Sequence, residues 1–311
     1  MEKVLVAGGA GFIGSNLCEA LLEKKKEVFC ADNLISGNKK NIAFLLENKR
    51  FHFIQQDINS FSFEEKFEEV YHLASLASPV DYFSKPVETM LVGSLGTKNL
   101  LDLALKNKAK FLFTSTSEIY GDPLEHPQKE SYWGNVNPVG ERSCYDESKR
   151  FSEALIKAYE KKFSFKGKIV RIFNTYGPKM KPDDGRVVPN FIVQALNNKP
   201  LTVYGNGKQT RSFCFVSDMV EGLIKMMESD FSGPVNLGNP EEFTILEFAE
   251  KIKKLSNKDL EIEFLPALKD DPKQRKPDIS LAVEKLGWKP KVPLEEGLKI
   301  TIDYFKGVNN L

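Results

Sequence analysis

The sequence contains few cysteines and histidines, and none of them stands in a metal-binding or redox pattern. The four cysteines are Cys18, Cys30, Cys144 and Cys214, and the three histidines are His52, His72 and His126. No two cysteines have the C-x-x-C spacing, and the histidines are dispersed along the chain. We therefore expect buried free thiols in a reducing cytoplasm, with neither disulfides nor a metal site.

Long apolar runs and an excess of charge of one sign are also missing. No apolar segment approaches the roughly 20 residues that a membrane helix needs, and the first residues run into a predicted strand without a signal-peptide cleavage site. Lys and Arg together number 44 and Asp and Glu number 43, which gives no electrostatic reason to expect nucleic acid or an anionic membrane as a partner. The expectation is a soluble cytoplasmic protein in which local Arg and Lys side chains hold any anionic ligand.

What the sequence does contain is an alternation of short apolar strands and amphipathic helices. The predicted strands are Lys3–Ala7, Glu27–Ala31, Phe51–Gln55, Val70–Leu73, Lys110–Ser115 and Lys168–Phe173. The predicted helices between them cover Ile13–Lys24, Val87–Lys106 and a segment from Tyr145 to about Lys161. Apolar strands separated by helices are typical of a parallel, doubly wound α/β sheet that is covered on both faces.

The character of the chain changes after Asn174, where Pro and Gly become frequent. Two further helices are predicted there, near Val188–Asn197 and Thr244–Leu255. We interpret residues 1–174 as a Rossmann domain that binds a dinucleotide. Residues 175–311 are then a smaller lobe that binds substrate and is interleaved with segments returning to the first domain.

A glycine-rich turn, GGAGFIG at residues 8–14, joins the first strand to the first helix. Glycines let the backbone approach a pyrophosphate closely, and the helix N-terminus offers free N–H groups and a positive dipole end. Asp32 closes the second strand, 18 residues after Gly14, where a carboxylate accepts hydrogen bonds from the adenosine ribose and repels a 2′-phosphate. This favours NAD over NADP. Asp57 closes the third strand and either meets the adenine amino group or caps its own loop.

Tyr145 and Lys149 are four residues apart on a predicted helix and therefore share one face. Thr116-Ser117-Glu118 follows the fifth strand, at the sheet edge where α/β proteins bind their ligands. A tyrosine acts as a base near neutral pH only if its pKa falls about 3 units from 10, which corresponds to about 4 kcal/mol. We expect the Lys149 ammonium and a positive nicotinamide ring to lower the pKa of Tyr145, with Thr116 donating a hydrogen bond to the same substrate oxygen.

Taken together, these motifs resemble the extended short-chain dehydrogenases/reductases that act on nucleotide sugars, and among them the UDP-glucuronate decarboxylases. The stretches that carry the resemblance are GGAGFIG (8–14), HLASLASPVDY (72–82), STSEIYGD (115–122), YWGNVNP (132–138), RSCYDESKR (142–150), RIFNTYGPKM (171–180), DGRVVPNFI (184–192), LTVYGNGKQTRSF (201–213), NLGNPEEFTILEFA (236–249) and DDPKQRKPD (270–278). They span nearly the whole chain.

The resemblance implies a role for each matching residue. The implied catalytic residues are Thr116, Ser117, Glu118, Tyr145, Lys149 and Arg275. The implied NAD-binding residues are Gly8, Gly11, Phe12, Ile13, Gly14, Asp32, Asn33, Ser36, Gly37, Asp57, Ile58, Leu73, Ala74, Ser75, Tyr145 and Lys149. The implied substrate-binding residues are Tyr82 and Arg142 at the sugar carboxylate, Asn174, Arg211 and Arg275 at the diphosphate, Tyr204 at the uracil, and Arg186 and Gln209.

Purely structural roles stay open as alternatives for three of these residues. Four other positions depart from the family pattern. Tyr82 and Tyr204 are alternatively packed aromatics, and Arg275 is alternatively a surface partner of Asp270 or Asp271. The departures are Gly93 for a usual Asn, Leu76 for a usual Pro, Ser148 for a usual Gly and Pro189 for a usual Ser. Gly93 matters most, because a polar side chain there would support a proton relay.

The activity implied by the resemblance is decarboxylation of UDP-glucuronate to UDP-xylose. C4 is oxidised, C6 leaves as CO2 from the resulting β-keto acid, C5 is protonated by Glu118 or a water it positions, and C4 is reduced again. The alternatives are a UDP-sugar 4-epimerase, a decarboxylase that releases the 4-keto pentose, and a non-catalytic NAD sensor. The resemblance also implies a homodimer through a four-helix bundle. The apolar residues on its predicted helices are Leu95, Leu100, Leu101, Leu103, Leu105, Phe151, Leu155, Ile156 and Tyr159.

Overall fold

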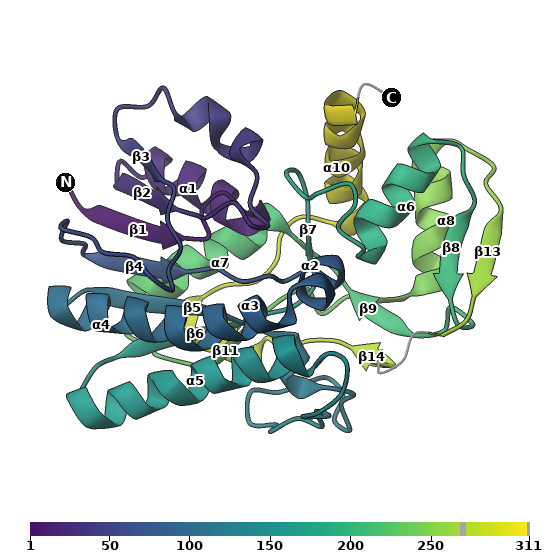
Figure 1. The fold of residues 1–311 in the computed structure, drawn as a ribbon. Helices are drawn as coiled ribbons and strands as arrows, with labels where there is room; N and C mark the ends of the chain where they lie inside the picture. The colour runs from purple at the N-terminus through teal and green to yellow at the C-terminus, as the bar shows by residue number, and fades with distance from the viewer. Residues whose placement is uncertain (268–271, 310–311) are drawn as a thin grey trace.

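A seven-stranded parallel sheet forms the centre of the computed structural model, which describes residues 1–267 and 272–309. Its strands are β1 (Lys3–Ala7), β2 (Glu27–Ala31), β3 (Phe51–Ile54), β4 (Glu69–His72), β5 (Lys110–Thr116), β6 (Gly167–Ile172) and β11 (Val235–Leu237), in the spatial order β11-β6-β5-β4-β1-β2-β3. The order reverses direction beside β1, between β4 and β2 (Figure 1). Such a switch point opens a crevice at the carboxyl ends of the strands.

Helices cover both faces of this sheet because its strands are apolar on both sides. Helices α1 (Phe12–Glu23) and α7 (Val216–Glu228) pack in one core with Val4, Val6 and Val28. Helices α4 (Thr97–Asn107) and α5 (Ser143–Phe163) pack in the second core with Leu5 and Phe113. Successive strand residues point to opposite faces, so each strand contributes to both cores. The predicted doubly wound parallel fold is confirmed.

A smaller lobe lies beside the carboxyl edge of the sheet, on the right of Figure 1. Its elements are β7 (Thr175–Tyr176), α6 (Val187–Leu196), β8 (Leu201–Tyr204), β9 (Thr210–Ser212), β10 (Cys214–Phe215), β12 (Glu242–Thr244), α8 (Ile245–Ser256), β13 (Ile262–Leu265), β14 (Gln274–Arg275) and α10 (Leu294–Asn309). Between them, α7, β11 and α9 (Ser280–Leu286) return to the central sheet. The division of the chain at residue 174 stays a prediction.

The long helix predicted over residues 87–106 is confirmed, although a π turn inside it was not predicted. Helix α3 (Pro86–Leu91) follows the short α2 (Pro79–Ser84), and the π turn η2 (Val92–Gly96) leads into α4. Inside the π turn, a Cβ atom added to Gly93 would lie 2.7 Å from the Cβ of Ser148 on α5. The two departures from the family pattern at 93 and 148 therefore face each other.

Other predicted boundaries differ from the observed ones by one or two residues. The helix predicted from Tyr145 begins at Ser143, and β5 continues to Thr116, while the 3₁₀ turns η1 (Lys39–Leu45) and η3 (Ser117–Tyr120) were not predicted. Several residues predicted for a helical interface are core residues instead. These are Leu100, Leu101, Leu103, Ile156 and Tyr159. Among the residues described, no helix has the length and apolarity needed to cross a membrane.

Candidate active site

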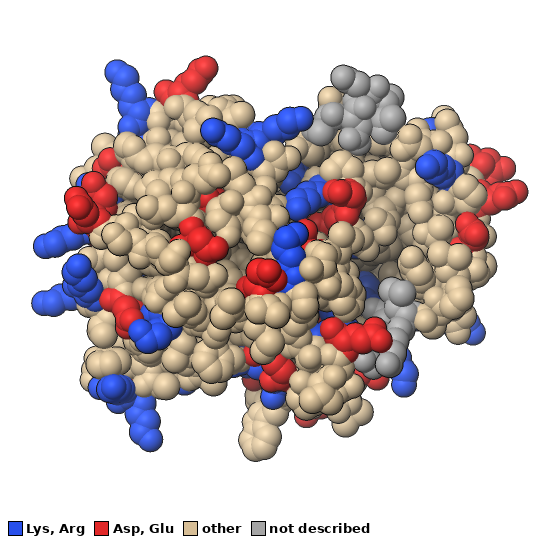
Figure 2. Space-filling view, viewed as in Figure 1, with Lys and Arg blue, Asp and Glu red and all other residues tan. Residues whose placement is uncertain are grey.

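A cleft of about 730 Å³ lies between the carboxyl edge of the sheet and the smaller lobe. Figure 2 shows acidic and basic side chains close together along the hollow between the two parts. Residues that directly follow β1, β4 and β5 line it, namely Gly8, Leu73 and Ser117. Of all the site residues predicted from the sequence, Arg275 alone is absent from the lining.

The glycine-rich turn brings the backbone of three segments into close contact at one end of the cleft. Gly8 has φ +82°, and a Cβ there would lie 2.6 Å from the backbone nitrogen of Ala74. A Cβ on Gly14 would lie 2.1 Å from the carbonyl oxygen of Gly8. Only glycine fits these two positions, and the free N–H groups at the start of α1 consequently face the cleft.

Asp32 is held at the end of β2 by two backbone N–H groups. Its Oδ2 accepts a hydrogen bond of 3.0 Å from Ala10, and its Oδ1 accepts one of 2.8 Å from Leu34. Burial raises the pKa of Asp32, which these two hydrogen bonds oppose. A Cβ on Gly37 would lie 2.6 Å from the same carboxylate. Asp57 also lines the cleft, where its Oδ1 caps the backbone N–H of Asn59 at 2.8 Å.

Tyr145 and Lys149 lie on the first two turns of α5, and both are buried. The Lys149 ammonium donates a 2.8 Å hydrogen bond to the carbonyl of Thr114, and burial lowers the pKa of Lys149 to about 7. Burial raises the pKa of Tyr145 to about 12, although the Thr116 hydroxyl opposes this through a hydrogen bond. Loss of solvent therefore outweighs the effect of the protein groups around the phenol. The predicted lowering, which combines the Lys149 ammonium with a positive nicotinamide ring, stays a prediction.

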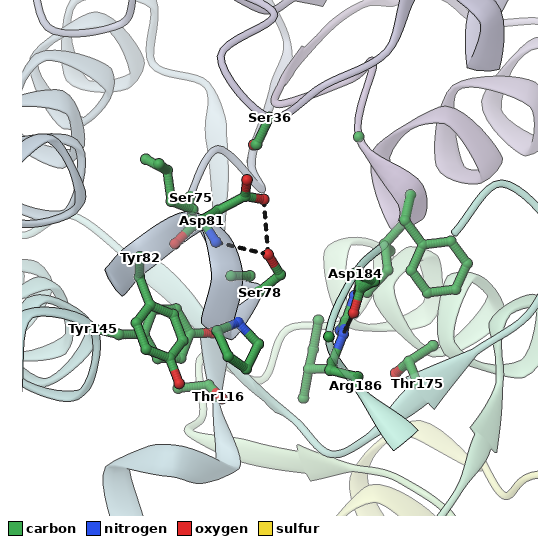
Figure 3. Close-up of a pocket in the computed structure, with 18 of the residues that line it drawn as sticks. Ser36, Ser75, Ser78, Asp81, Tyr82, Thr116, Tyr145, Thr175, Asp184 and Arg186 are labelled. Carbon is green, nitrogen blue, oxygen red and sulfur yellow. Dashed lines mark hydrogen bonds and ion pairs between the residues drawn. The ribbon is translucent and has the colours of Figure 1, made fainter. Parts of the chain in front are cut away.

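The ring of Tyr82 stacks on the ring of Tyr145, with centroids 5.2 Å apart and an angle of 12° between the rings. In Figure 3, Tyr82, Tyr145 and Thr116 lie on one side of the cavity, and Asp184, Arg186 and Thr175 lie opposite. Tyr82 is only 1% exposed, and its hydroxyl has no hydrogen-bond partner among the residues that the structure describes. It is thus both a packed aromatic and a buried polar group beside the proposed base.

Glu118 receives two guanidinium groups that come from distant parts of the chain. Its Oε2 accepts a 2.7 Å hydrogen bond from Arg142 and a 3.2 Å hydrogen bond from Arg275. Burial alone would raise the pKa of Glu118, but these two guanidiniums hold it well below its usual range. Arg275 also bonds the carbonyl oxygens of Ser117 and Gly121.

Arg275 is 1% exposed and lies behind Glu118, away from the lining of the cleft. Its predicted contact with the diphosphate remains a prediction that this placement does not favour. The alternative, a surface ion pair, disagrees with its burial, and its suggested partners Asp270 and Asp271 lie outside the described residues. The structure supports a third role, in which Arg275 fixes Glu118.

The remaining predicted substrate residues line the half of the cleft that the smaller lobe provides. Arg186 forms an ion pair with both carboxylate oxygens of Asp184, and Gln209 donates a 2.7 Å hydrogen bond to the carbonyl of Tyr204. The others are Asn174, Tyr204 and Arg211. Six charged residues of the lining were not predicted from the sequence, namely Asp81, Glu88, Glu141, Lys179, Lys181 and Asp184. The signal for the last three was the charged stretch between Gly177 and Arg186.

Comparison with known families places the chain in a class of sugar-nucleotide enzymes. The model of the GDP-mannose 4,6 dehydratase family matches residues 5–301. The chain therefore belongs to this family.

Within the family, the chain is similar to curated UDP-glucuronic acid decarboxylases. It is 53% identical to UDP-glucuronic acid decarboxylase 1 of Arabidopsis thaliana over 304 residues, which cover 98% of this chain and 70% of that protein. It is 50% identical to UDP-glucuronic acid decarboxylase 1 of Danio rerio, with coverage of 98% and 72%.

Solved structures of epimerases have the same fold. The UDP-glucuronic acid 4-epimerase of Bacillus cereus, in complex with UDP-glucuronic acid and NAD, is 33% identical with a TM-score of 0.90, and covers 98% of this chain and 99% of its own. The UDP-glucose 4-epimerase of Thermotoga maritima is 30% identical with a TM-score of 0.91, and covers 99% of both chains.

Proposed function

We propose that this protein is an NAD-dependent UDP-glucuronate decarboxylase that forms UDP-xylose. The observation that carries the proposal is the juxtaposition of Glu118, clamped by Arg142 and Arg275, with the Tyr145, Lys149 and Thr116 group in one cleft. Identities of 49–53% to curated decarboxylases over 98% of the chain support it. The epimerase alternative has less support, because the two epimerase structures compared above are 30% and 33% identical to the chain.

The residues at the glycine-rich end of the cleft fit NAD. Gly8 and Gly14 leave room that a Cβ would fill, and Asp32 stands where a ribose hydroxyl would bind. The chemistry that NAD supplies when bound is reversible acceptance of a hydride from C4 of the sugar, together with a positive ring charge that favours a phenolate at Tyr145. Gly8, Gly14 and Asp32 would hold it.

Three side chains have separate roles at the C4 oxygen of the sugar, namely those of Tyr145, Thr116 and Lys149. Tyr145 takes the hydroxyl proton as C4 is oxidised and returns it as C4 is reduced. Thr116 donates a hydrogen bond to the same oxygen and stabilises the oxyanion that develops when CO2 leaves. Lys149, anchored on the carbonyl of Thr114, keeps a donor in place beneath the tyrosine ring.

The test follows the redox balance of the reaction with UDP-glucuronate. We expect CO2 release and UDP-xylose formation without stoichiometric accumulation of reduced nicotinamide, measured by absorbance while the sugars are separated. One NADH per CO2, with a 4-keto pentose as the main product, would show that the final reduction is absent. Epimerised UDP-galacturonate without CO2 would favour the epimerase alternative.

We infer that the protein is a cytoplasmic homodimer whose interface is a four-helix bundle, in which each subunit contributes α5 and the helix that runs from α3 through the π turn to α4. Support comes from large apolar side chains that remain exposed on α3, the π turn and α5. They are Val87, Met90, Leu91, Leu95 and Phe151. The four cysteines are buried and free, which suits a reducing compartment.

A further inference from the structure

A second, smaller cavity of about 290 Å³ lies behind the wall of the main cleft. Glu118 and Arg142 line both cavities and so form the partition between them. The outer rim of the second cavity includes the exposed residues Asn137 and Lys273 and the half-buried Asp122. The second cavity therefore connects the bulk solvent to the rear of Glu118.

Asp146 lines this second cavity and does not line the main cleft. It is 6% exposed, and its Oδ1 has no hydrogen-bond partner among the described residues. Its Oδ2 is 4.0 Å from Nε of Arg142, beyond hydrogen-bonding distance. This buried carboxyl lies in the first turn of α5, in a long ion pair with Arg142, and it is next to Tyr145 in sequence.

The proposed reaction requires a proton donor that is resupplied from solvent. The substrate loses a carboxylate as CO2 and gains a C5–H bond, so each turnover consumes one proton from solvent. The proton that Tyr145 takes from the C4 hydroxyl cannot supply it, because that proton returns to the C4 oxygen in the last step. Glu118 is a poor donor at neutral pH, since Arg275 and Arg142 hold its pKa low.

We propose that the second cavity is the route by which solvent protons reach the active site, and that Asp146 holds the proton that is transferred to C5. When CO2 leaves, the electron pair of the C5–C6 bond becomes part of a C4 enolate. The Asp146 O–H bond then breaks, its proton passes through Glu118 or water beside it, and the C5–H bond forms with the enolate electrons. The Asp146 carboxylate recovers a proton from solvent through the cavity. Asp146 thus acts through Glu118 and touches no reacting atom.

The charges around Asp146 agree with this role. Burial and the neighbouring Glu118 carboxylate raise the pKa of Asp146 toward neutrality, although Arg142 and Arg275 oppose the shift. Two nearby carboxyls with pKa values pushed apart form an acid and base pair. The titratable and charged groups that face Asp146 are Glu118 on η3, Arg275 on β14, Tyr82 on α2, and Arg142, Cys144, Tyr145 and Glu147 on or beside α5.

The proposal rests on the proposed decarboxylase function, and the experiment separates the two. The wild-type enzyme, Asp146→Asn and Asp146→Glu are compared for CO2 release from UDP-glucuronate between pH 5.5 and 9. Thermal unfolding and NAD⁺ binding verify the fold of each variant. Asp122→Asn is the matched control, because this carboxylate lines the same cavity at its exposed rim.

We expect wild-type kcat to fall as pH rises above neutrality, since the donor is the protonated carboxyl. Asp146→Asn should lower kcat by about 100-fold with little change in KM, and should abolish this alkaline decline. Reduced nicotinamide should accumulate before the steady state, because protonation follows oxidation. Asp146→Glu should recover the alkaline decline, and Asp122→Asn should behave as wild type.

A second variant tests the cavity without touching the buried carboxyl. Asn137→Trp fills the rim from an exposed position and should slow turnover while leaving NAD⁺ binding unchanged. The proposed proton transfer from Asp146 is overturned, and the proposed function is not, if the wild type releases CO2 but Asp146→Asn keeps the wild-type pH profile and nicotinamide signal. If the Asn variant does not fold, unimpaired turnover by Asn137→Trp overturns it. If the wild type releases no CO2, the proposed function and the proposed proton transfer from Asp146 are both overturned.

Discussion

At the scale of single residues, the reaction depends on the protonation state of the Tyr145 phenol. Its pKa is raised to about 12 by burial, and the protein groups around it do not reverse this. Proton removal is therefore unfavourable until positive charge arrives with the cofactor. This arrangement would restrict oxidation of the sugar to the complex in which cofactor and substrate are both bound.

Tyr145→Phe should reduce CO2 release by at least about 100-fold, because the variant lacks the group that accepts the proton of the C4 hydroxyl. The substitution removes one hydroxyl and keeps the ring that stacks on Tyr82. Thermal unfolding and NAD⁺ binding should therefore match those of the wild type. Turnover within tenfold of wild type would exclude Tyr145 as the base.

Asp32 decides the cofactor at the same scale. Asp32→Ala should weaken the preference for NAD⁺ over NADP⁺ by about tenfold, since a carboxylate that repels the 2′-phosphate is lost. Titration of both dinucleotides measures the preference. Asp32→Asn is the control for backbone geometry, because it retains an acceptor for the N–H of Ala10. Tighter binding of NADP⁺ to the wild type would contradict the assignment.

At the scale of elements, the junction between the π turn and α5 depends on a pair of small residues. Gly93 accepts a 2.6 Å hydrogen bond from Ser152 through its carbonyl, and its Cα faces Ser148. A side chain at 93 therefore requires that the side chain at 148 be absent. The family resemblance has this exchanged arrangement, with Asn and Gly at the two positions.

Gly93→Asn should destabilise the protein by about 1–3 kcal/mol, because its Cβ would overlap Ser148. Ser148→Gly alone should cost about 1 kcal/mol through lower helix propensity. The double variant should be more stable than the sum of the single changes predicts. A double-mutant cycle from chemical denaturation measures this coupling, and strict additivity would contradict the contact.

At the scale of the whole molecule, exposed apolar residues on α3, η2 and α5 leave one face of the subunit uncovered. Phe151→Glu should shift the protein from dimer to monomer in sedimentation experiments, because a charge would be buried in the bundle. Phe264→Glu is the matched control, since Phe264 is 56% exposed on the other lobe, compared with 49% for Phe151. A monomeric wild type would contradict the proposed interface.

The sequence by itself determined the parallel sheet, the glycine-rich loop and part of the set of residues that line the cleft. These features are readable because strand periodicity, the glycine requirement at Gly8 and Gly14, and the i, i+4 spacing of Tyr145 and Lys149 are local. Helix boundaries shifted by one or two residues, and the helix through Gly93 contains a π turn where it packs against Ser148 and Ser152, a tertiary contact that local sequence does not reveal.

Only the tertiary structure determined which charged side chains contact one another and in which direction their pKa values shift. Glu118 and Arg275 are 157 residues apart, and their contact depends on β14 pairing with β9 in the smaller lobe. The direction of each pKa shift follows from burial, which spacing does not reveal, so the raised pKa of Tyr145 was not foreseen. The cavity behind Glu118 is likewise enclosed by segments that the sequence separates, because solvent access is a property of the assembled chain.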